Sequence, residues 1–179
     1  MFKRIAVAVD GSGTSNQGLR TAIDLAADQG ATLVVLHVVE DMLSAVAGEV
    51  DSYVSRNYTE EVQRNIREAG RKVIAKAEAA ARKAELDTVV ALIEPRGRTV
   101  SESIVAEAKK QKADVIVLGT HGRRGLRRMV MGSDAEAVVR EAKVPVLLIR
   151  EDGSRSSRRA SAQPEKRASA ANGSKNVSA

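Results

Sequence analysis

A doubly wound α/β fold, with a five-stranded parallel sheet of flavodoxin-like or Rossmann-like type and helices on both faces, is predicted by two features of the sequence. Five short runs of Val, Ile, Leu and Ala alternate with segments whose apolar residues recur at helical spacing. The chain is also 43% hydrophobic but only 2% aromatic, so its core must be aliphatic, as is typical of helices packed on a parallel sheet. Since crossovers between parallel strands are right-handed, this alternation favours the doubly wound topology.

The first strand and the first helix are separated by a well-marked loop. Residues 5–9 form an unbroken apolar run that is too short for a helix, and a loop rich in Gly and Ser follows from Asp10 to Ser15. Residues 32–39 form the second strand. The helix before it ends at Gly30, a residue that suits a left-handed C-terminal cap, and its apolar face consists of Leu19, Ala22, Ile23 and Ala26.

The stretch between the second and third strands is less regular. Residues 42–58 have no firm period and predict a loop with at most a short helix. Thr59 opens a long helix, because two glutamates follow it in a first turn where negative charge is favourable, and this helix ends near Leu86. Residues 88–93 are the third strand, and Pro-Arg-Gly at 95–97 makes a turn after it.

Two Ser/Thr-x-x-Glu patterns predict helix starts in the second half of the chain. Thr99 with Glu102 opens a helix over residues 100–110, and Ser133 with Glu136 opens a helix that ends near Ala142. Apolar runs precede and follow this second helix and complete the sheet, at residues 115–118 and 146–149.

Composition divides the chain into a folded domain, residues 1–151, and a basic tail, residues 152–179. The tail is rich in Ser, Arg and Ala and has almost nothing large and apolar, so it is predicted to be disordered. From Glu151 onward there are six basic and three acidic residues, which account for half of the net charge of +6. Because the domain itself is nearly balanced, nucleic acid is not an expected partner.

The residue inventory excludes several classes of chemistry. The sequence has no Cys, which rules out disulfides and thiolate nucleophiles, and its two His residues have no metal-ligand spacing. His37 closes the second strand, where a core or edge role is expected. The first apolar run ends at Asp10, too soon for a signal peptide or a membrane span, so a cytoplasmic protein is expected.

The strongest chemical signal is Gly119-Thr-His-Gly122, followed after nine residues by Gly132-Ser133. The first motif ends the fourth strand and the second begins the next helix, where unpaired N–H groups and the positive end of the dipole suit a phosphate. Alternatively, the glycines serve loop geometry alone and Ser133 only caps its helix. Positive charge nearby comes from Arg123, Arg124, Arg127 and Arg128.

Asp10 is the second signal, since it ends the first strand just before a Gly-Ser loop. In an open parallel sheet, ligands bind beyond the carboxyl ends of the strands, where the strand order reverses. If the first and fourth strands are neighbours, Asp10 faces the Gly119 loop and can accept hydrogen bonds from a base or a ribose. The alternative is that Asp10 caps the first helix or braces its own turn.

Five segments together resemble the universal stress protein family, in order and with matching spacing over residues 2–150. The glycine pattern is similar to the ATP-binding motif of the family's nucleotide-binding branch. The resemblance implies a stress-response protein that binds ATP, acts through its nucleotide state and protein partners, and is at most a slow ATPase. The segments are Ile5-Ala-Val-Ala-Val-Asp-Gly-Ser12, Leu36-His-Val38, Val117-Leu-Gly-Thr-His-Gly122, Gly132-Ser133 and Val144-Pro-Val-Leu-Leu-Ile149.

The resemblance also implies where adenine and ribose would bind. Asp10 and the backbone around Ala8 and Val9 would meet the adenine and the ribose. Val38 would pack near the adenine. The implied partner is a second copy of the chain, joined through the last strand, Val146 to Ile149.

For the phosphates, the resemblance implies the glycine motifs. Gly119, His121 and Gly122 would line the ribose and phosphates, while Gly132 and Ser133 would hold the phosphates with helix N–H groups. ATP is the implied ligand, and an accompanying Mg²⁺ is left open.

One residue departs from the family pattern. Members that bind ATP often have a small or hydroxylated pair after Gly-Ser, but this chain has Asp134-Ala135. The charge of Asp134 suits the helix dipole and would repel a nearby triphosphate. Two other functions therefore stay open. One is a nucleotide-free dimeric interaction module of the non-binding branch. The other lies in the tail, either as polyanion binding or as phosphorylation at Arg158-Arg159-Ala-Ser161 and Lys166-Arg167-Ala-Ser169 by a kinase that prefers basic residues.

Overall fold

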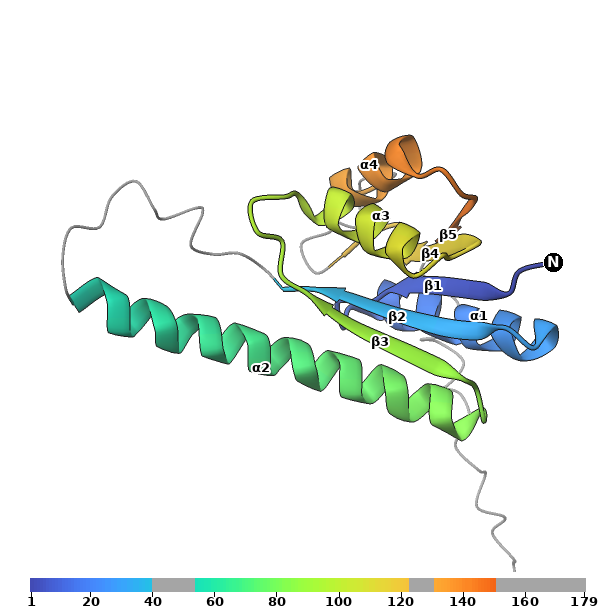
Figure 1. Cartoon of the computed structure of the whole chain (residues 1–179), viewed down its shortest axis with the longest axis horizontal. Helices are drawn as coiled ribbons and strands as arrows, with labels where there is room; N and C mark the ends of the chain where they lie inside the picture. Colours follow the sequence, from blue (N-terminus) through green and yellow to red (C-terminus); the bar gives the residue numbers. More distant parts are fainter. Residues whose placement is uncertain (40–53, 123–130, 151–179) are drawn as a thin grey trace, which may run out of the picture.

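A twisted five-stranded sheet lies between two layers of helices (Figure 1). The computed structural model describes residues 1–39, 54–122 and 131–150, with the backbone alone over 54–59. All strand pairs in this sheet are parallel, and the order across it is β3-β2-β1-β4-β5. The strands are β1 (Arg4–Ala8), β2 (Thr32–Val38), β3 (Thr88–Ile93), β4 (Val115–Gly119) and β5 (Val146–Ile149).

This order confirms the doubly wound fold that the sequence predicts, and it identifies the type. The chain runs outward from β1 to β2 and β3, then returns to the other side of β1 for β4 and β5. That is the Rossmann order and differs from the flavodoxin order, in which the third strand lies beside the first. The strand order therefore reverses between β1 and β4, which pair Ile5 with Val115 and Val7 with Val117.

Two helices cover each face of the sheet. Ile5 and Val7 pack with the helices of one face, while Ala6 between them packs with the helices of the other, as alternation along a strand requires. The central strands are buried on both sides, which explains why they read as unbroken apolar runs. The helices are α1 (Gly13–Gln29) and α2 (Val54–Lys83) on one face, and α3 (Val100–Lys110) and α4 (Ser133–Glu141) on the other.

Helix α2 starts five residues earlier than the sequence predicts. The prediction placed its first residue at Thr59 and its end near Leu86, but the helix runs from Val54 to Lys83. Figure 1 shows that its first turns extend past the carboxyl end of β2. A helix segment beyond the sheet is under no pressure to keep an apolar stripe, so no period marks its start. The rest of the uneven stretch, residues 40–53, lies outside the described residues, as does the basic tail.

Of the two predicted capping boxes, one is confirmed and one is wrong. Thr99 Oγ1 accepts a hydrogen bond from the Glu102 N–H at 3.2 Å, and a Glu102 carboxylate oxygen accepts one from the Thr99 N–H at 2.8 Å. The Thr99 N–H donated to this carboxylate, and after it the Thr99 side chain, hold the pKa of Glu102 below its ordinary value. In α4, however, Ser133 is the first helical residue and the cap is Gly132, which has no side chain to offer.

The N-terminus of the chain is tied to the loop before β4 through Asp114. One of its carboxylate oxygens accepts hydrogen bonds from the N–H groups of Lys3 and Arg4, at 2.7 and 2.8 Å. The two backbone donors lower the pKa of Asp114 from its ordinary value of 3.8. The charged form is therefore favoured in the folded state, and it joins the start of β1 to the start of β4.

We expect Asp114→Ala to lower the free energy of unfolding at neutral pH by about 1–2 kcal/mol, because two backbone donors lose a charged acceptor that is partly exposed to solvent. Since folding lowers this pKa, the contribution of Asp114 is fully present above pH 3.8 and is lost as the pH falls further. Urea unfolding at pH 7 and pH 3 measures both effects. Asp114→Asn keeps one acceptor oxygen and should retain part of the stability. If Asp114→Ala lowered the free energy of unfolding by the same amount at pH 7 and at pH 3, this account would be contradicted.

Candidate functional site

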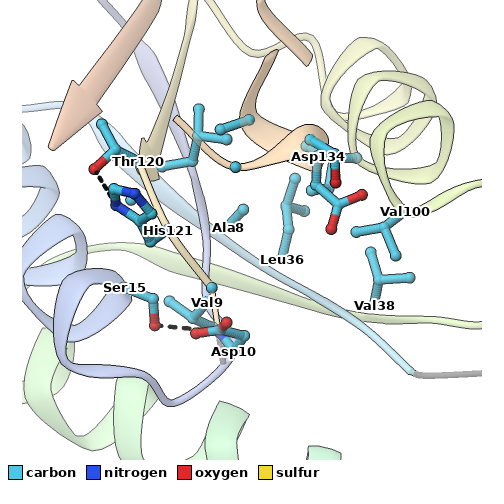
Figure 2. A pocket seen from close by; sticks show the side chains of 17 residues that line it. Ala8, Val9, Asp10, Ser15, Leu36, Val38, Val100, Thr120, His121 and Asp134 are labelled. Carbon is cyan, nitrogen blue, oxygen red and sulfur yellow. Dashed lines mark hydrogen bonds between the residues drawn. The ribbon is translucent and has the colours of Figure 1, made fainter. Parts of the chain in front are cut away.

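A cavity of about 310 Å³ opens at the carboxyl ends of β1 and β4, where the strand order reverses. This is the position at which open α/β sheets bind ligands. The structure brings all nine predicted site residues together in its lining (Figure 2), namely Ala8, Val9, Asp10, Val38, Gly119, His121, Gly122, Gly132 and Ser133.

The cavity also has walls that the sequence predictions did not include. Val100 and Ile104 come from α3, one helical turn apart, and Leu36 comes from β2. An apolar pair at i and i+4 was visible in the sequence, but nothing local indicated that it would face a ligand cavity. The other additions are Ser15, Leu118, Thr120, Asp134 and Ala135.

The loop after β1 is held by a closed set of hydrogen bonds. Ser12 is the cap of α1 and its hydroxyl accepts from the Ser15 N–H at 3.1 Å, so the alternative that Asp10 caps this helix is wrong. The Ser15 hydroxyl accepts from the N–H groups of Asp10 and Gly11, both at 3.2 Å (Figure 2). These hydrogen bonds within the loop fix its conformation, and they hold Asp10 in one position.

Asp10 uses its two carboxylate oxygens differently. Oδ1 accepts from the Ser12 N–H at 2.8 Å, which confirms that Asp10 braces its own turn. Oδ2 faces the glycine loop, since a Cβ built on Gly122 would lie 2.8 Å from it. The Asp10 carboxylate after β1 and the glycine loop after β4 therefore lie next to each other where the strand order reverses. Asp10 Oδ2 faces Gly122, and both residues line the cavity.

Behind the cavity floor, His37 supports the backbone of Val9. Its Nδ1 lies 2.6 Å from the Val9 carbonyl oxygen, and the side chain is buried, in agreement with the predicted core role. The ring packs directly against Gly70 of α2, where a Cβ would lie 2.9 Å from His37 Cδ2 and 3.0 Å from Leu92 Cδ1. Gly70 was not singled out by the sequence, because its role depends on how closely α2 approaches the sheet.

Close packing against neighbouring segments explains why two of the motif positions are glycine. A Cβ on Gly119 would lie 2.8 Å from the methyl group of Thr14 in α1. A Cβ on Gly132 would lie 3.3 Å from the carbonyl oxygen of Thr120, which also accepts the Gly132 N–H at 2.8 Å. Both glycines therefore let neighbouring chain segments approach closely, as the geometric alternative predicted, and both still line the cavity.

The start of α4 supplies backbone donors to the cavity. Because the Gly132 N–H is donated to Thr120, the first donors without a partner among the described residues are the N–H groups of Ser133, Asp134 and Ala135. All three residues line the cavity. Together with the positive end of the helix dipole, they form an arrangement that suits an anion such as a phosphate.

Side chains near this helix end add polar groups. His121 Nδ1 lies 3.0 Å from the Thr120 hydroxyl, and Figure 2 shows the ring at the same end of the cavity as Thr120. The predicted arginine cluster, residues 123–128, lies outside the described residues. Within the described part of the chain, no three His, Asp or Glu side chains are grouped so as to hold a metal ion.

At the other end of the cavity, Asp134 is the one charged residue among apolar side chains of the described chain. Val38 from β2 and Val100 from α3 lie there in Figure 2, with Leu36 between them and the polar end. The cavity therefore combines an apolar slot with a cluster of anion-binding donors. A flat heterocycle carrying a phosphate chain matches both halves, because its faces are apolar and its tail is anionic.

Comparisons with known sequences give the same family from a family model and from individual relatives. A family model described as "Universal stress protein family" matches residues 1–150. The chain is 33% identical over 155 residues to universal stress protein YxiE of Bacillus subtilis, covering 84% of this chain and 100% of that protein. It is 31% identical over 150 residues to universal stress protein MJ0531 of Methanocaldococcus jannaschii, covering 84% and 83%.

Solved structures show the same fold. Universal stress protein UspA from Lactobacillus plantarum superimposes with a TM-score of 0.70 at 21% identity, covering 83% of this chain and 97% of that one. A universal stress protein in complex with cAMP gives a TM-score of 0.57 at 20% identity, with 82% and 96% covered. One from Archaeoglobus fulgidus in complex with dAMP gives 0.55 at 24% identity, again with 82% and 96% covered.

Proposed function

The chain belongs to the universal stress protein family, and on that premise we propose that it binds an adenine nucleotide, ATP foremost, in the cavity between β1 and β4. The observation that carries the proposal is the pairing of an apolar slot with three unpartnered N–H groups of α4 in the described chain, placed where the strand order reverses. The complexes of structural neighbours with cAMP and dAMP support an adenine-bearing ligand.

The proposed roles follow from the position of each residue around the cavity. Val38 packs on the adenine, with the backbone of Ala8 and Val9 beneath it. Asp10 accepts hydrogen bonds from the ribose hydroxyls, since its carboxylate stands beyond the carboxyl end of β1, where open α/β sheets bind their ligands. The base and sugar would thus be held by β1 and β2.

The phosphates belong between the loop after β4 and the start of α4. Gly119, His121 and Gly122 line their path from β4, and the α4 N-terminus from Ser133 onward donates to them. Gly132 contributes by its close approach to Thr120 and not by its N–H group. An Mg²⁺ accompanying ATP would be held mainly by the phosphates themselves, since this ion keeps several waters and uses few protein ligands.

We propose that the protein acts in the stress response through its nucleotide state and protein partners, in the cytoplasm, and not through rapid catalysis. Fast hydrolysis requires a base that orients an attacking water beside the terminal phosphate. Among the described residues that line the cavity, Asp10 is engaged in its own turn, and His121 Nδ1 lies 3.0 Å from the Thr120 hydroxyl. Asp134, the third candidate base, has a carboxylate whose charge would repel the phosphates. Hydrolysis would therefore be slow at most.

The proposal is tested by identifying the small molecules released when the purified protein is denatured, with calorimetric titration of ATP into nucleotide-free protein. Adenine nucleotide in stoichiometric amount, or saturable binding heat, is the expected result. A protein that releases no nucleotide and shows no binding heat and no thermal shift with ATP would overturn the proposal. It would favour the nucleotide-free interaction module instead.

We also propose that two copies of the chain associate through β5. Within the described residues this strand pairs with β4 alone and so forms one edge of the sheet, and Leu147 on it is 37% exposed. An unpaired strand edge with an exposed apolar side chain is a template for another strand.

Leu147→Glu is expected to convert the dimer to a monomer in sedimentation velocity, because it puts a charge into the apolar contact. Val90→Glu is the matched control, since Val90 is 41% exposed on the opposite edge strand, β3. It should leave the dimer unchanged. A wild type that is already monomeric, or a Leu147 variant that stays dimeric, would exclude association through β5.

A further inference from the structure

Ser15 lines the cavity with a polar side chain that is only 4% exposed. It lies in the first turn of α1, and its Oγ accepts the N–H groups of two consecutive residues, Asp10 and Gly11, each at 3.2 Å. Gly11 has a left-handed φ of 84, and the two N–H groups converge on this one oxygen. Converging backbone N–H groups of this kind commonly bind anions. Here the Ser15 hydroxyl occupies that place.

Other N–H groups at the start of α1 are also used within the loop. The Ser12 N–H is donated to Asp10 Oδ1 at 2.8 Å, and the Ser15 N–H is donated to the Ser12 hydroxyl at 3.1 Å. Gly13 and Thr14, which lie between them, do not line the cavity. Within the described chain, the start of α1 therefore offers a ligand no cluster of donors like that of α4. It offers the Asp10 carboxylate, which can only accept hydrogen bonds.

This difference between the two helix starts matches the two polar parts of a nucleotide. Phosphate oxygens are acceptors and suit the N–H groups of α4, whereas ribose hydroxyls can donate and suit a carboxylate. Whether Asp10 can receive them depends on how accurately it is held. The Ser12 N–H fixes Oδ1, and the Ser15 hydroxyl fixes the backbone from which the side chain extends. Oδ2 is thereby kept facing Gly122, on the cavity lining.

We propose that Ser15 is a positioning residue that makes the site selective for nucleotides with ribose hydroxyls, and that it acts through Asp10. This inference rests on the proposed function, because it assumes that the ribose lies at Asp10. By filling the converging N–H groups of Asp10 and Gly11, Ser15 also excludes a phosphate from the loop after β1. The start of α4 is then the place for the phosphates, and the orientation of the nucleotide in the cavity follows.

The test compares ATP with 2′,3′-dideoxyATP, which lacks both ribose hydroxyls, by calorimetric titration into nucleotide-free protein. Wild type should bind ATP about tenfold more tightly, as expected for hydrogen bonds to a charged acceptor. Ser15→Ala should reduce this preference to about threefold or less by weakening ATP alone, because an acceptor that is no longer held loses most of a directional contact. Ser15→Cys, which keeps the shape but is a weak acceptor, should give the same loss and serves if the alanine variant does not fold.

Ser103→Ala is the matched control, with thermal unfolding as the check on the fold. Its hydroxyl is also buried, at 2% exposure, and donates to the Thr99 carbonyl at 2.8 Å, but Ser103 does not line the cavity. This variant should keep the tenfold preference. Equal weakening of both nucleotides by Ser15→Ala would show that Ser15 only supports the cavity, and this would overturn the inference.

Asp10→Ala separates an effect through Asp10 from a direct contact of Ser15 with the ribose. It should remove the preference for ATP, and adding Ser15→Ala to it should change the ratio of affinities no further. A further loss of preference in the double variant would overturn the inference, as would wild-type protein that binds both nucleotides equally tightly. In both cases the proposed nucleotide binding would still stand. Wild-type protein that binds neither nucleotide would remove the proposed function and the inference together.

Discussion

Replacement of Gly122 by valine is expected to weaken ATP binding about a hundredfold, equivalent to about 2.7 kcal/mol, and to leave the fold intact. A Cβ at this position would lie 2.8 Å from Asp10 Oδ2, well inside van der Waals contact. The carboxylate cannot simply retreat, because its other oxygen holds the Ser12 N–H at 2.8 Å. The valine would therefore displace either the Asp10 turn or the glycine loop, and both line the cavity.

The fold should survive this change because residue 122 is exposed. Calorimetric titration with ATP measures the affinity, and thermal unfolding without nucleotide checks the fold. Ala69→Val is a suitable control, since it adds methyl groups at an exposed position of α2 that does not line the cavity. A Gly122 variant that binds ATP as tightly as wild type would show that this loop has no part in the site.

Gly70→Val is expected to lower the free energy of unfolding by about 2–3 kcal/mol, because it adds atoms to a closely packed part of the core. The new Cβ would lie 2.9 Å from His37 Cδ2 and 3.0 Å from Leu92 Cδ1. These two residues face each other in the register of β2 and β3, so α2 would have to lift off both strands. The His37 ring is further held by its contact of 2.6 Å with the Val9 carbonyl.

Urea unfolding of Gly70→Val and Ala69→Val gives a matched comparison within one helix. Ala69 is the exposed neighbour of Gly70, so its valine variant carries only the helix-propensity cost, about 0.5 kcal/mol. Because His37 supports the floor of the cavity, Gly70→Val should also weaken ATP binding several-fold. Equal stability of the two variants would mean that α2 does not rest on His37 and Leu92 as closely as the structure shows.

The local features of the sequence predicted the elements that depend on local physics. The run at residues 5–9 was too short and too apolar for anything but a buried strand, and β1 lies there within one residue. Gly30 ends α1 with φ 61, as a left-handed cap should. Thr99 and Glu102 form the capping box that their spacing indicates. In each case the interactions that stabilise the element lie within a few residues of it.

The errors arose where distant segments decide the outcome. Ser133 has a glutamate at the right spacing for a capping box, yet it is the first residue of α4. The cap is Gly132, which is held by a hydrogen bond to Thr120 across the loop. Helix α2 begins at Val54, in a stretch whose apolar residues show no helical period. Its first turns lie past the carboxyl end of β2 and so do not pack on the sheet.

For the candidate site, the sequence by itself determined the chemistry of the lining. Glycines and a carboxylate that follow buried strands must stand at one edge of a parallel sheet, because all carboxyl ends meet there. Only the tertiary structure decided which strands are neighbours, and with that the meeting of Asp10 and Gly122. It likewise brought Val100 and Ile104 of α3 to the cavity and separated the surroundings of Asp134 from those of Glu136. Strand order and helix docking depend on side chains far apart in the sequence, and no local pattern of residues encodes which of them will touch.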